Sequence, residues 1–397
     1  MSLTAPYFSI GIPTRNRGEL VEQAVKYILA QTFGDFELII ADSDETDDTV
    51  DRLKRIEDPR LRYFKTRGKT GPENFQFCAD QAKGEYFVFL TDRLMLRPHA
   101  LETIFRHSEA RRFPNIRYHC DTFDDRQSPP KIWKPEYCHG NKLVNADEVM
   151  DHFVGENDGP ELSKIIPMPQ LSAIHRSVLE KIKGVDSRPV FAPIVPDMWC
   201  CFAQLAVCEE EMLNIGEMLS VFVMRMGAGL SFLHKKDSGT KFLREICKNG
   251  ELDMEHVPIK ATPTSNMIYN DYMRARKLFG GRLERYPLPW PTYFTGVYRN
   301  FEDAMKVGVN MRAEYQEWKT ALKAQPPEVQ AEVKRRLKKT KSFSKLETKR
   351  LLKRVRYNIG LNHLETSLKA LRPSTKKKVS TPHKTLAEYI ATEPSTS

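Results

Sequence analysis

Residues 7–17 read YFSIGIPTRNR, and residues 36–42 read FELIIAD. Each stretch is a short apolar run that ends in polar residues, as the buried strands of a parallel sheet do. Between them, residues 18–31 carry apolar side chains three or four positions apart, which is the spacing of one helix face. We therefore expect a strand at 7–12, a helix at 18–31 and a strand at 36–41, which together form a βαβ unit.

The same alternation continues over the first hundred residues. It predicts a helix at 46–56, a strand at 61–64, a helix at 74–82 that ends at the C-cap glycine Gly84, and a strand at 86–90. The sequence thus favours an α/β fold with a mainly parallel, Rossmann-like sheet flanked by helices. Beyond residue 100, prolines cluster in loops up to Pro196. In that part we expect strands at 171–174 and 218–224 and helices at 177–182, 197–208 and 238–283.

Length and composition exclude several classes of protein. The chain has 397 residues, of which 40% are apolar and 7 are cysteines without a repeated spacing. These values predict two or three folded units rather than a disordered chain or a small disulfide scaffold. No run approaches the roughly 20 apolar residues that cross a bilayer, and residues 1–7 lack the pattern of a signal peptide. We therefore expect a cytoplasmic protein.

The net charge of +10 is concentrated in one segment. Residues 334–378 hold 17 Lys and Arg against 2 Asp and Glu, whereas the rest of the chain holds 45 against 50. Leu337, Leu346, Leu351, Leu352, Val355 and Ile359 recur among these basic residues at loosely helical intervals. Two interpretations stay open: a solvated charged helix, or a helix attracted to the inner, anionic face of a membrane. Nucleic acid is the least favoured partner, because the segment has almost no aromatic residues for base stacking.

A specific series of motifs runs through the first 235 residues. In order, it comprises IPTRNR at 12–17, AQTF at 30–33, DFELIIAD at 35–42, DPRLRY at 58–63, GEYFVFLTD at 84–92, LSAIHRS at 171–177, GVD at 184–186, PD at 196–197 and NIGEMLSVF at 214–222. With this series the chain resembles the family 2 glycosyltransferases, which have the GT-A fold. The resemblance covers about residues 7–235, and residues 236–397 carry no motif of it.

The resemblance implies a nucleotide-sugar site at the carboxyl ends of the strands. Its expected lining is Pro13, Thr14, Arg15, Asp42, Arg67, Asn74, Asp92 and Arg93. Asp42 would accept a hydrogen bond from the base or ribose of the nucleotide. For three of these residues an ordinary structural role stays open: Asp42 as a turn or N-cap residue, Arg67 as a surface charge and Asn74 as a helix N-cap.

Thr91-Asp92-Arg93 takes the place of the paired aspartates with which the family usually holds a divalent metal on the donor diphosphate. Only one carboxylate, Asp92, is present in this triplet. One carboxylate can still hold Mg²⁺ or Mn²⁺ when the substrate phosphates and water complete the shell, and we expect a weak metal site at Asp92. Arg93 could instead supply fixed positive charge. Loss of activity with retention of the fold is a third interpretation.

Asp197 is the expected catalytic base, because it matches the acidic residue that the family places after the proline-rich loop. An N-cap role for Asp197 is the alternative. Arg225 and His234 follow the last expected strand and could reach the diphosphate, although a lone His or Arg is more often structural. A zinc site built from His119-Cys120 and Cys138-His139 is disfavoured, because no CxxC pair is present.

These observations predict an inverting glycosyltransferase. It would move a sugar from a nucleotide diphosphate sugar to a hydroxyl of a glycan, polysaccharide or lipid-linked acceptor. We expect a nucleotide-binding half at 1–105, an acceptor half at 106–235, a helical region at 236–330 and a basic, partly helical or disordered tail at 331–397. A non-catalytic nucleotide-sugar-binding protein is the main alternative. A nucleotidyltransferase is disfavoured, because residues 13–18 are not a Gly-rich phosphate loop.

Overall fold

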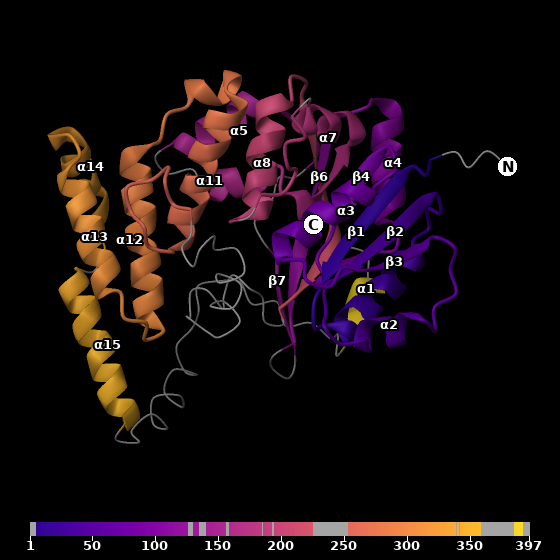
Figure 1. The fold of residues 1–397 in the computed structure, drawn as a ribbon, viewed down its shortest axis with the longest axis horizontal. Coiled ribbons are helices and arrows are strands. Elements are labelled where there is room, and N and C mark those ends of the chain that lie inside the picture. The colour runs from indigo at the N-terminus through magenta and orange to yellow at the C-terminus, as the bar shows by residue number, and fades with distance from the viewer. Residues whose placement is uncertain are drawn as a thin grey trace.

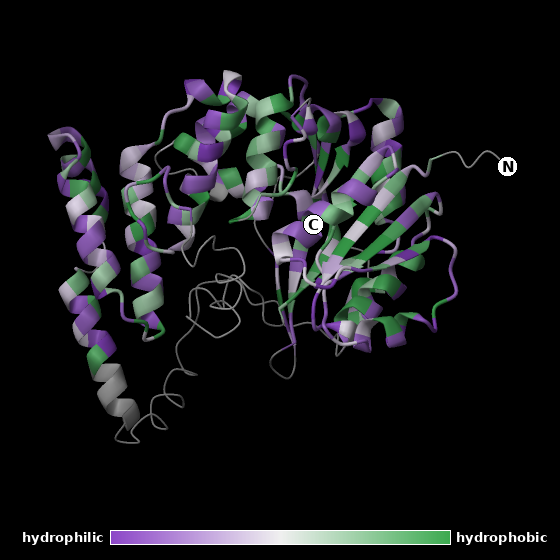
Figure 2. Ribbon diagram, in the orientation of Figure 1, coloured by the Kyte–Doolittle hydropathy of each residue, from purple (hydrophilic) through white to green (hydrophobic). Residues whose placement is uncertain are grey.

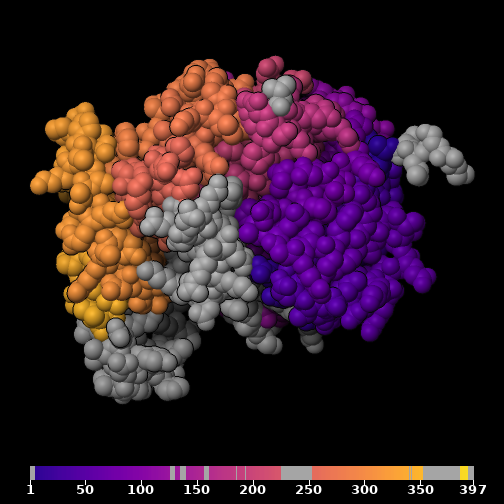
Figure 3. Space-filling view, viewed as in Figure 1, coloured from indigo at the N-terminus to yellow at the C-terminus, as the bar shows by residue number. Residues whose placement is uncertain are grey.

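The structure is a computed structural model that describes residues 5–125, 130–134, 140–155, 159–184, 186–192, 194–224, 253–338, 340, 342–358 and 385–391. In this part of the chain, a mixed sheet lies beside a group of long helices formed by the residues after 253 (Figure 1). In the space-filling view, the amino-terminal residues and the later helices occupy opposite sides of the visible face (Figure 3).

The described strands form one sheet with the order β3-β2-β1-β4-β9-β6-β10-β5. Their bounds are β1 Phe8–Thr14, β2 Phe36–Asp42, β3 Leu61–Lys65, β4 Tyr86–Phe89, β5 Leu94–Leu96, β6 Asn115–Asp124, β7 Lys131–Trp133, β8 Lys142–Val144, β9 Ser172–His175 and β10 Met212–Val223. The first four are parallel to one another, whereas β9 is antiparallel to both β4 and β6. The α/β class is therefore confirmed, but the described sheet is mixed rather than mainly parallel.

The first strands are buried on both faces, which explains their continuous apolar sequences (Figure 2). Pro13 lies in the central strand β1, although proline has no N–H to donate. The backbone oxygen of Gly11 accepts the N–H of Leu90, which follows the end of β4. Backbone groups of alternate residues point to the same neighbouring strand, so the next residue of β1 that points toward β4 is Pro13. Because β4 has already ended at Phe89, the missing N–H of Pro13 leaves no strand hydrogen bond unmade.

Helices cover both faces of this sheet. Those of the first 210 residues are α1 Gly18–Leu29, α2 Asp48–Leu53, α3 Gly71–Gln81, α4 Ala100–Ala110, α5 Ala146–Val154, α6 Gly159–Ile165, the 3₁₀ turn η1 Pro169–Leu171, α7 Arg176–Lys183 and α8 Pro196–Val207. Apolar residues of α1 and α4 share one core cluster with β1 and β5, and those of α3 and α7 share another with Phe87 and Phe89. The sheet is thus the middle layer of three.

Gly84 has a different role from the one that the sequence suggested. Helix α3 ends with Ala82 as its C-cap, so the expected C-cap glycine is wrong. A Cβ atom on Gly84 would lie 2.5 Å from the backbone nitrogen of Ser9, and the N–H of Gly84 donates to the Ser9 hydroxyl at 2.6 Å. A glycine is needed here because the chain passes directly against β1.

Helix α8 lies between the sheet and the later helices. Cys200 and Ala203 belong to the cluster under the sheet, whereas Trp199, Phe202 and Leu205 belong to a larger cluster with the residues after 253. Nearly every residue from Trp199 to Leu205 is buried, because each side of the helix faces a different core. A helix that is apolar on all sides is the expected sequence for this position.

The later helices are α11 Thr264–Phe279, the 3₁₀ turn η2 Gly281–Arg285, α12 Trp290–Lys306, α13 Arg312–Lys323, α14 Pro327–Leu337 and α15 Phe343–Asn358. The boundary expected at 330/331 falls inside α14. Beyond that boundary, Val333 and Leu346 are buried in the helical core and Phe343 stacks on Tyr315. The boundary expected at 235/236 lies outside the described residues.

A short segment near the carboxyl end, α17 (Leu386–Ala391), docks on the first half of the chain. The Tyr389 hydroxyl donates to Asp121 at 2.7 Å, and the Arg97 guanidinium, itself paired with Asp121 at 3.0 Å, donates to the backbone oxygens of Tyr389 and Ile390. Arg97 and Asp121 are each 1% exposed, so α17 supplies further hydrogen bonds to a buried ion pair.

Among the described residues, no helix combines the length and the apolar character that a membrane crossing requires.

Candidate functional site

The polar ends of three neighbouring strands meet at one edge of the sheet. Thr14 at the end of β1 is the register partner of Asp42 at the end of β2, and the turn Thr91-Asp92-Arg93 follows β4 on the other side of β1. The backbone of Thr14 accepts the Ser43 N–H at 3.1 Å. Because parallel strands end at the same edge, side chains from distant parts of the sequence come together here.

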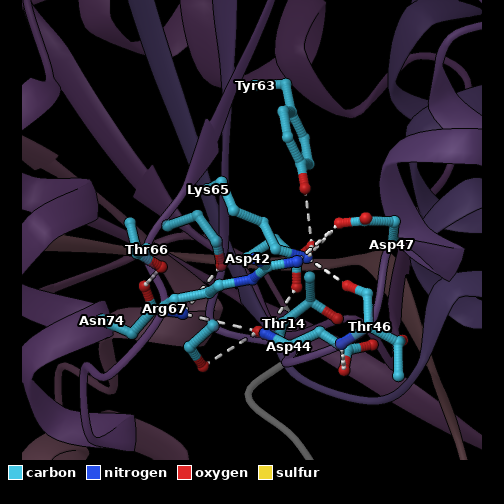
Figure 4. Close-up of polar contacts among 12 residues, drawn as sticks. Thr14, Asp42, Asp44, Thr46, Asp47, Tyr63, Lys65, Thr66, Arg67 and Asn74 are labelled. Carbon is cyan, nitrogen blue, oxygen red and sulfur yellow. Dashed lines mark hydrogen bonds and ion pairs between the residues drawn. The ribbon is translucent and has the colours of Figure 1, made fainter.

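Asp42 is the centre of a hydrogen-bonded cluster (Figure 4). Its side chain is fully buried, and its Oδ2 accepts from the Tyr63 hydroxyl at 2.7 Å and from Lys65 Nζ at 3.2 Å. Its Oδ1 accepts the Asp44 N–H at 2.9 Å, as in an Asx turn. Asp42 therefore does make a turn hydrogen bond, but its other oxygen faces two groups from β3. Burial and the nearby carboxylates raise the pKa of Tyr63.

Arg67 lies at the outer side of this cluster. Its guanidinium donates to Asp47 Oδ1 at 2.8 Å, and Lys65 Nζ lies 3.5 Å from the same oxygen. The Arg67 side chain is half-exposed, so it is a surface charge that nevertheless borders the Asp42 cluster. Both interpretations of Arg67 that the sequence left open are compatible with this position.

Asn74 is a buried link between the strand ends. Its Nδ2 donates to the Ala41 oxygen at 2.7 Å, and its Oδ1 accepts from the Thr66 hydroxyl at 2.7 Å. The N-cap of α3 is Thr70, which forms a capping box with Glu73. The N-cap interpretation of Asn74 is therefore wrong. Its amide instead fixes the loop after β3 against the end of β2.

Asp92 forms a partly buried ion pair that was not predicted from the sequence. Its Oδ1 lies 3.0 Å from Arg17 Nη1, and its Oδ2 accepts from the Thr14 hydroxyl at 3.4 Å. Asp92 is 3% exposed. Burial raises the pKa of its carboxyl, and Arg17 and Arg93 offset part of this rise by stabilising the charged form.

Arg93 lies beside this pair, with its guanidinium 4.5 Å from the centre of the Phe222 ring of β10. Burial and the positive charge of Arg17 both lower the pKa of Arg93, while Asp92 opposes the shift. The turn thus gathers two guanidinium groups around one carboxylate.

This donor set does not fit a divalent metal well. Mg²⁺ and Mn²⁺ require several oxygen ligands, but the described residues contain no group of three acidic, His or Cys side chains. One oxygen of Asp92 already faces Arg17, whose charge would repel a dication. The metal site expected at Asp92 stays a prediction, and the described contacts favour the alternative in which arginine supplies the positive charge.

Asp197 lies in the first turn of α8. The helix begins at Pro196 with Val195 as its N-cap, so the N-cap interpretation of Asp197 is wrong. Asp197 Oδ1 accepts the Met198 N–H at 2.9 Å, and Oδ2 accepts from Gln170 Nε2 at 3.3 Å. Burial raises the pKa of the Asp197 carboxyl, and the two hydrogen bonds oppose this rise. A carboxylate with a raised pKa is a stronger base than an exposed one.

The strand pairing brings Asp197 toward the same edge of the sheet as Asp92. Strand β9 runs antiparallel to β4, with Ala173 opposite Val88, so η1 precedes β9 next to the carboxyl end of β4. Gln170 belongs to η1 and donates to Asp197. Asp92 follows the same end of β4 in the sequence. Asp197, through Gln170, and Arg93 are therefore both placed near the carboxyl end of β4.

The remaining expected site residues are less informative. Pro13 is buried in β1, and Arg15 is half-buried in the segment that follows it. Arg225, His234, Cys138 and His139 lie outside the described residues. His119 Nδ1 lies 3.1 Å from the Arg117 guanidinium, and burial together with that charge lowers the pKa of His119 to about 3.

Several residues of the site were not predicted from the sequence: Arg17, Tyr63, Lys65 and Gln170. Tyr63 and Lys65 alternate on a strand that pairs with β2, and Lys65 is the register partner of Asp42. This alternation along the strand could have predicted that both side chains lie on the side of Asp42. Arg17 and Gln170 carried no such signal, because each meets its aspartate only through the tertiary fold.

Comparison with known proteins agrees with this arrangement. Residues 9–182 match the family model "Glycosyl transferase family 2". The chain is similar to the GalNAc(5)-diNAcBac-PP-undecaprenol beta-1,3-glucosyltransferase of Campylobacter jejuni, with 38% identity over 25% of this chain and 34% of the relative. It is also similar to the UDP-Glc:alpha-D-GlcNAc-diphosphoundecaprenol beta-1,3-glucosyltransferase WfaP of Escherichia coli, with 33% identity over 24% of this chain and 41% of the relative.

A solved structure, S. aureus TarS 1-349, is similar with a TM-score of 0.40 and 13% identity over 76% of this chain and 83% of that chain. The matched segments span less than half of the two glucosyltransferases' own lengths. The family match covers β1 to α7, which includes the three strand ends of the site. Residues 9–182 thus match family 2 glycosyl transferases, in agreement with the motifs of the sequence.

Proposed function

We propose that the chain is an inverting glycosyltransferase that uses a nucleotide diphosphate sugar. The observation that carries this proposal is the link through Thr14 between two sets of groups. Its backbone binds the segment after Asp42, and its hydroxyl binds Asp92. A cluster suited to a nucleotide and a cationic cluster suited to a diphosphate are therefore neighbours at the edge where ligands of open α/β sheets bind.

In the proposed reaction the acceptor hydroxyl oxygen attacks the anomeric carbon of the donor. A carbon–oxygen bond to the acceptor forms while the bond to the diphosphate breaks, and Asp197 takes the hydroxyl proton. Inversion follows from this single displacement. The leaving diphosphate gains negative charge, and the guanidinium groups of Arg17 and Arg93 stabilise it. Asp92 holds Arg17 in place through their contact of 3.0 Å.

Asp42 is the proposed nucleotide contact. Tyr63 and Lys65 fix the orientation of its carboxylate, and Asn74 fixes the adjoining loop. Because the Asp42 side chain is fully buried in this arrangement, a base or ribose would reach it by replacing one of these partners. Arg15 and Arg67 would border the same pocket.

The proposed acceptor is lipid-linked. This part of the proposal rests on the names of the two glucosyltransferases that resemble the chain, both of which specify an undecaprenol-linked acceptor. A glycan or polysaccharide hydroxyl is the alternative acceptor. A lipid-linked acceptor would require the enzyme to work at a membrane surface, and the basic residues 334–378 would attract it to anionic lipid.

The membrane contact can be tested without removing a packed helix. Replacing Lys376, Lys377 and Lys378 by Gln is expected to weaken binding to vesicles of 30% phosphatidylserine by about 10²-fold, at roughly 1 kcal/mol for each charge. The matched control removes three exposed charges elsewhere, in Lys54→Gln, Arg55→Gln and Lys323→Gln. Equal binding of both triple variants in a sedimentation assay would contradict the membrane proposal.

The second candidate function is a non-catalytic protein that binds a nucleotide sugar. Its supporting observation is the lone carboxylate of the turn at 91–93. The two candidates differ in donor turnover, because an enzyme should hydrolyse its donor slowly without acceptor. Hydrolysis that disappears in Asp197→Asn while nucleotide binding persists would favour the enzyme.

The experiment that tests the proposed donor is a thermal-shift screen. UDP-, GDP-, CDP- and dTDP-sugars are each added with Mn²⁺ and with EDTA. One nucleotide at about 100 times its Kd should stabilise the folded chain by about 2.7 kcal/mol, which raises Tm by a few degrees. We expect the same shift with EDTA. A shift that requires Mn²⁺ would instead support the metal site at Asp92, and no shift with any nucleotide sugar would contradict the proposed donor class.

A further inference from the structure

The helical part of the chain supplies a buried carboxylate to the start of α8. Asp271 belongs to α11, which packs against α8 (Figure 1). Its side chain is fully buried, and its Oδ2 accepts the N–H of Val195 at 2.7 Å. Val195 is the N-cap of α8 and lies two residues before Asp197. A single side chain thus holds the point at which the helix with the candidate base begins.

The second oxygen of Asp271 is buried and has no hydrogen-bond partner among the described residues. A buried carboxylate oxygen without a partner is costly, and an apolar side chain would pack in this position without that cost. The other oxygen offsets part of this cost by accepting the Val195 N–H. The accepted Val195 N–H is one of the donors that a helix start leaves unsatisfied.

Three charged groups face Asp271. Arg274, from the same helix, stabilises its charge, whereas Asp197 and Asp253 oppose it. Burial is the largest influence, and it raises the pKa of Asp271 to about 7. Arg274 also lies over the Trp199 ring of α8 at 5.5 Å, so the α8–α11 contact is polar at two points close to Asp197.

We propose that Asp271 is a positioning residue for Asp197, which it holds in place through the start of α8. This inference rests on the proposed role of Asp197 as the base. It gives the helices after residue 253 a function in the reaction: they complete the site of the glycosyl transferase domain from outside the segment that matches the family.

Two variants test the hydrogen bond that Asp271 accepts from Val195. Asp271→Asn keeps an oxygen that can accept the Val195 N–H and removes the charge. We expect this variant to fold and to keep kcat within threefold of that of the unmodified chain, because the Val195 N–H still has an acceptor. Asp271→Leu removes the acceptor, and we expect kcat to fall 10- to 100-fold with the KM for the donor changed less than threefold.

The matched control is Asp303→Asn, which removes an exposed carboxylate of α12 and should leave kcat unchanged. Folding of each variant is checked by Tm and by nucleotide binding. A folded Asp271→Asn variant with kcat as low as that of Asp271→Leu would overturn the inference, as would a folded Asp271→Leu variant with kcat within twofold. If the unmodified chain turns over no donor, or if Asp197→Asn stays fully active, the proposed function fails together with the inference.

Discussion

Replacing Asp197 by Asn is expected to lower kcat by about 10²- to 10⁴-fold, because an amide cannot take the proton of the acceptor hydroxyl. The side-chain oxygen of Asn can still accept the Met198 N–H, so the first turn of α8 should keep its geometry. The KM for the donor should change little, because the base acts on the acceptor. Product formation at saturating donor is the measurement.

The control for this substitution is Asp186→Asn, which changes an exposed carboxylate that pairs with Arg188 in the same half of the chain. It should retain full activity. If Asp197→Asn keeps more than a tenth of kcat while its Tm and nucleotide affinity are unchanged, the base must be another residue.

The second large effect is expected at the turn after β4. Arg93→Ala should lower kcat/KM by about 10²- to 10³-fold, the usual cost of losing one group that stabilises charge in a transition state. Arg93→Lys should recover part of this loss, because an ammonium keeps the charge but not the planar fork of donors. Activity of the unmodified chain should resist EDTA.

Arg111→Ala is a matched control, since its guanidinium also lies over an aromatic ring, that of Phe113, at the opposite edge of the sheet. Its activity should be unchanged. The opposite result would be an active Arg93→Ala variant together with a loss of activity in EDTA that Mn²⁺ restores. It would show that a metal held by Asp92, and not Arg93, contacts the diphosphate. Nucleotide affinity measured with and without EDTA distinguishes the arginine from the metal independently of turnover.

The local pattern of apolar residues made the first half of the fold predictable. The apolar runs that became β1, β2 and β4 are buried on both faces, and only strands covered by helices on both sides require such runs. The helix at 18–29 followed from its own spacing of apolar residues. These signals are contained within about 15 residues each, so the sequence carries them without reference to the rest of the chain.

Contacts between distant segments could not be predicted in the same way. Gly84 appeared to be a helix cap because it follows a helix, whereas its real constraint is the backbone of Ser9, which is 75 residues away. The basic helix near residue 346 appeared to be a free tail because its sequence is highly charged. In the structure Leu346 is buried, and Arg350 pairs with Glu347 inside the helical core.

The sequence by itself determined the α/β class, the resemblance to family 2 glycosyltransferases and the strand ends that carry Thr14, Asp42 and Asp92. Only the tertiary structure decided which groups face those residues. Arg17 meets Asp92, and Asp271 meets the start of α8, across separations of about 75 residues each. The reason is physical: secondary structure depends on neighbours along the chain, whereas the charge state and orientation of a buried carboxylate depend on the groups that packing places around it.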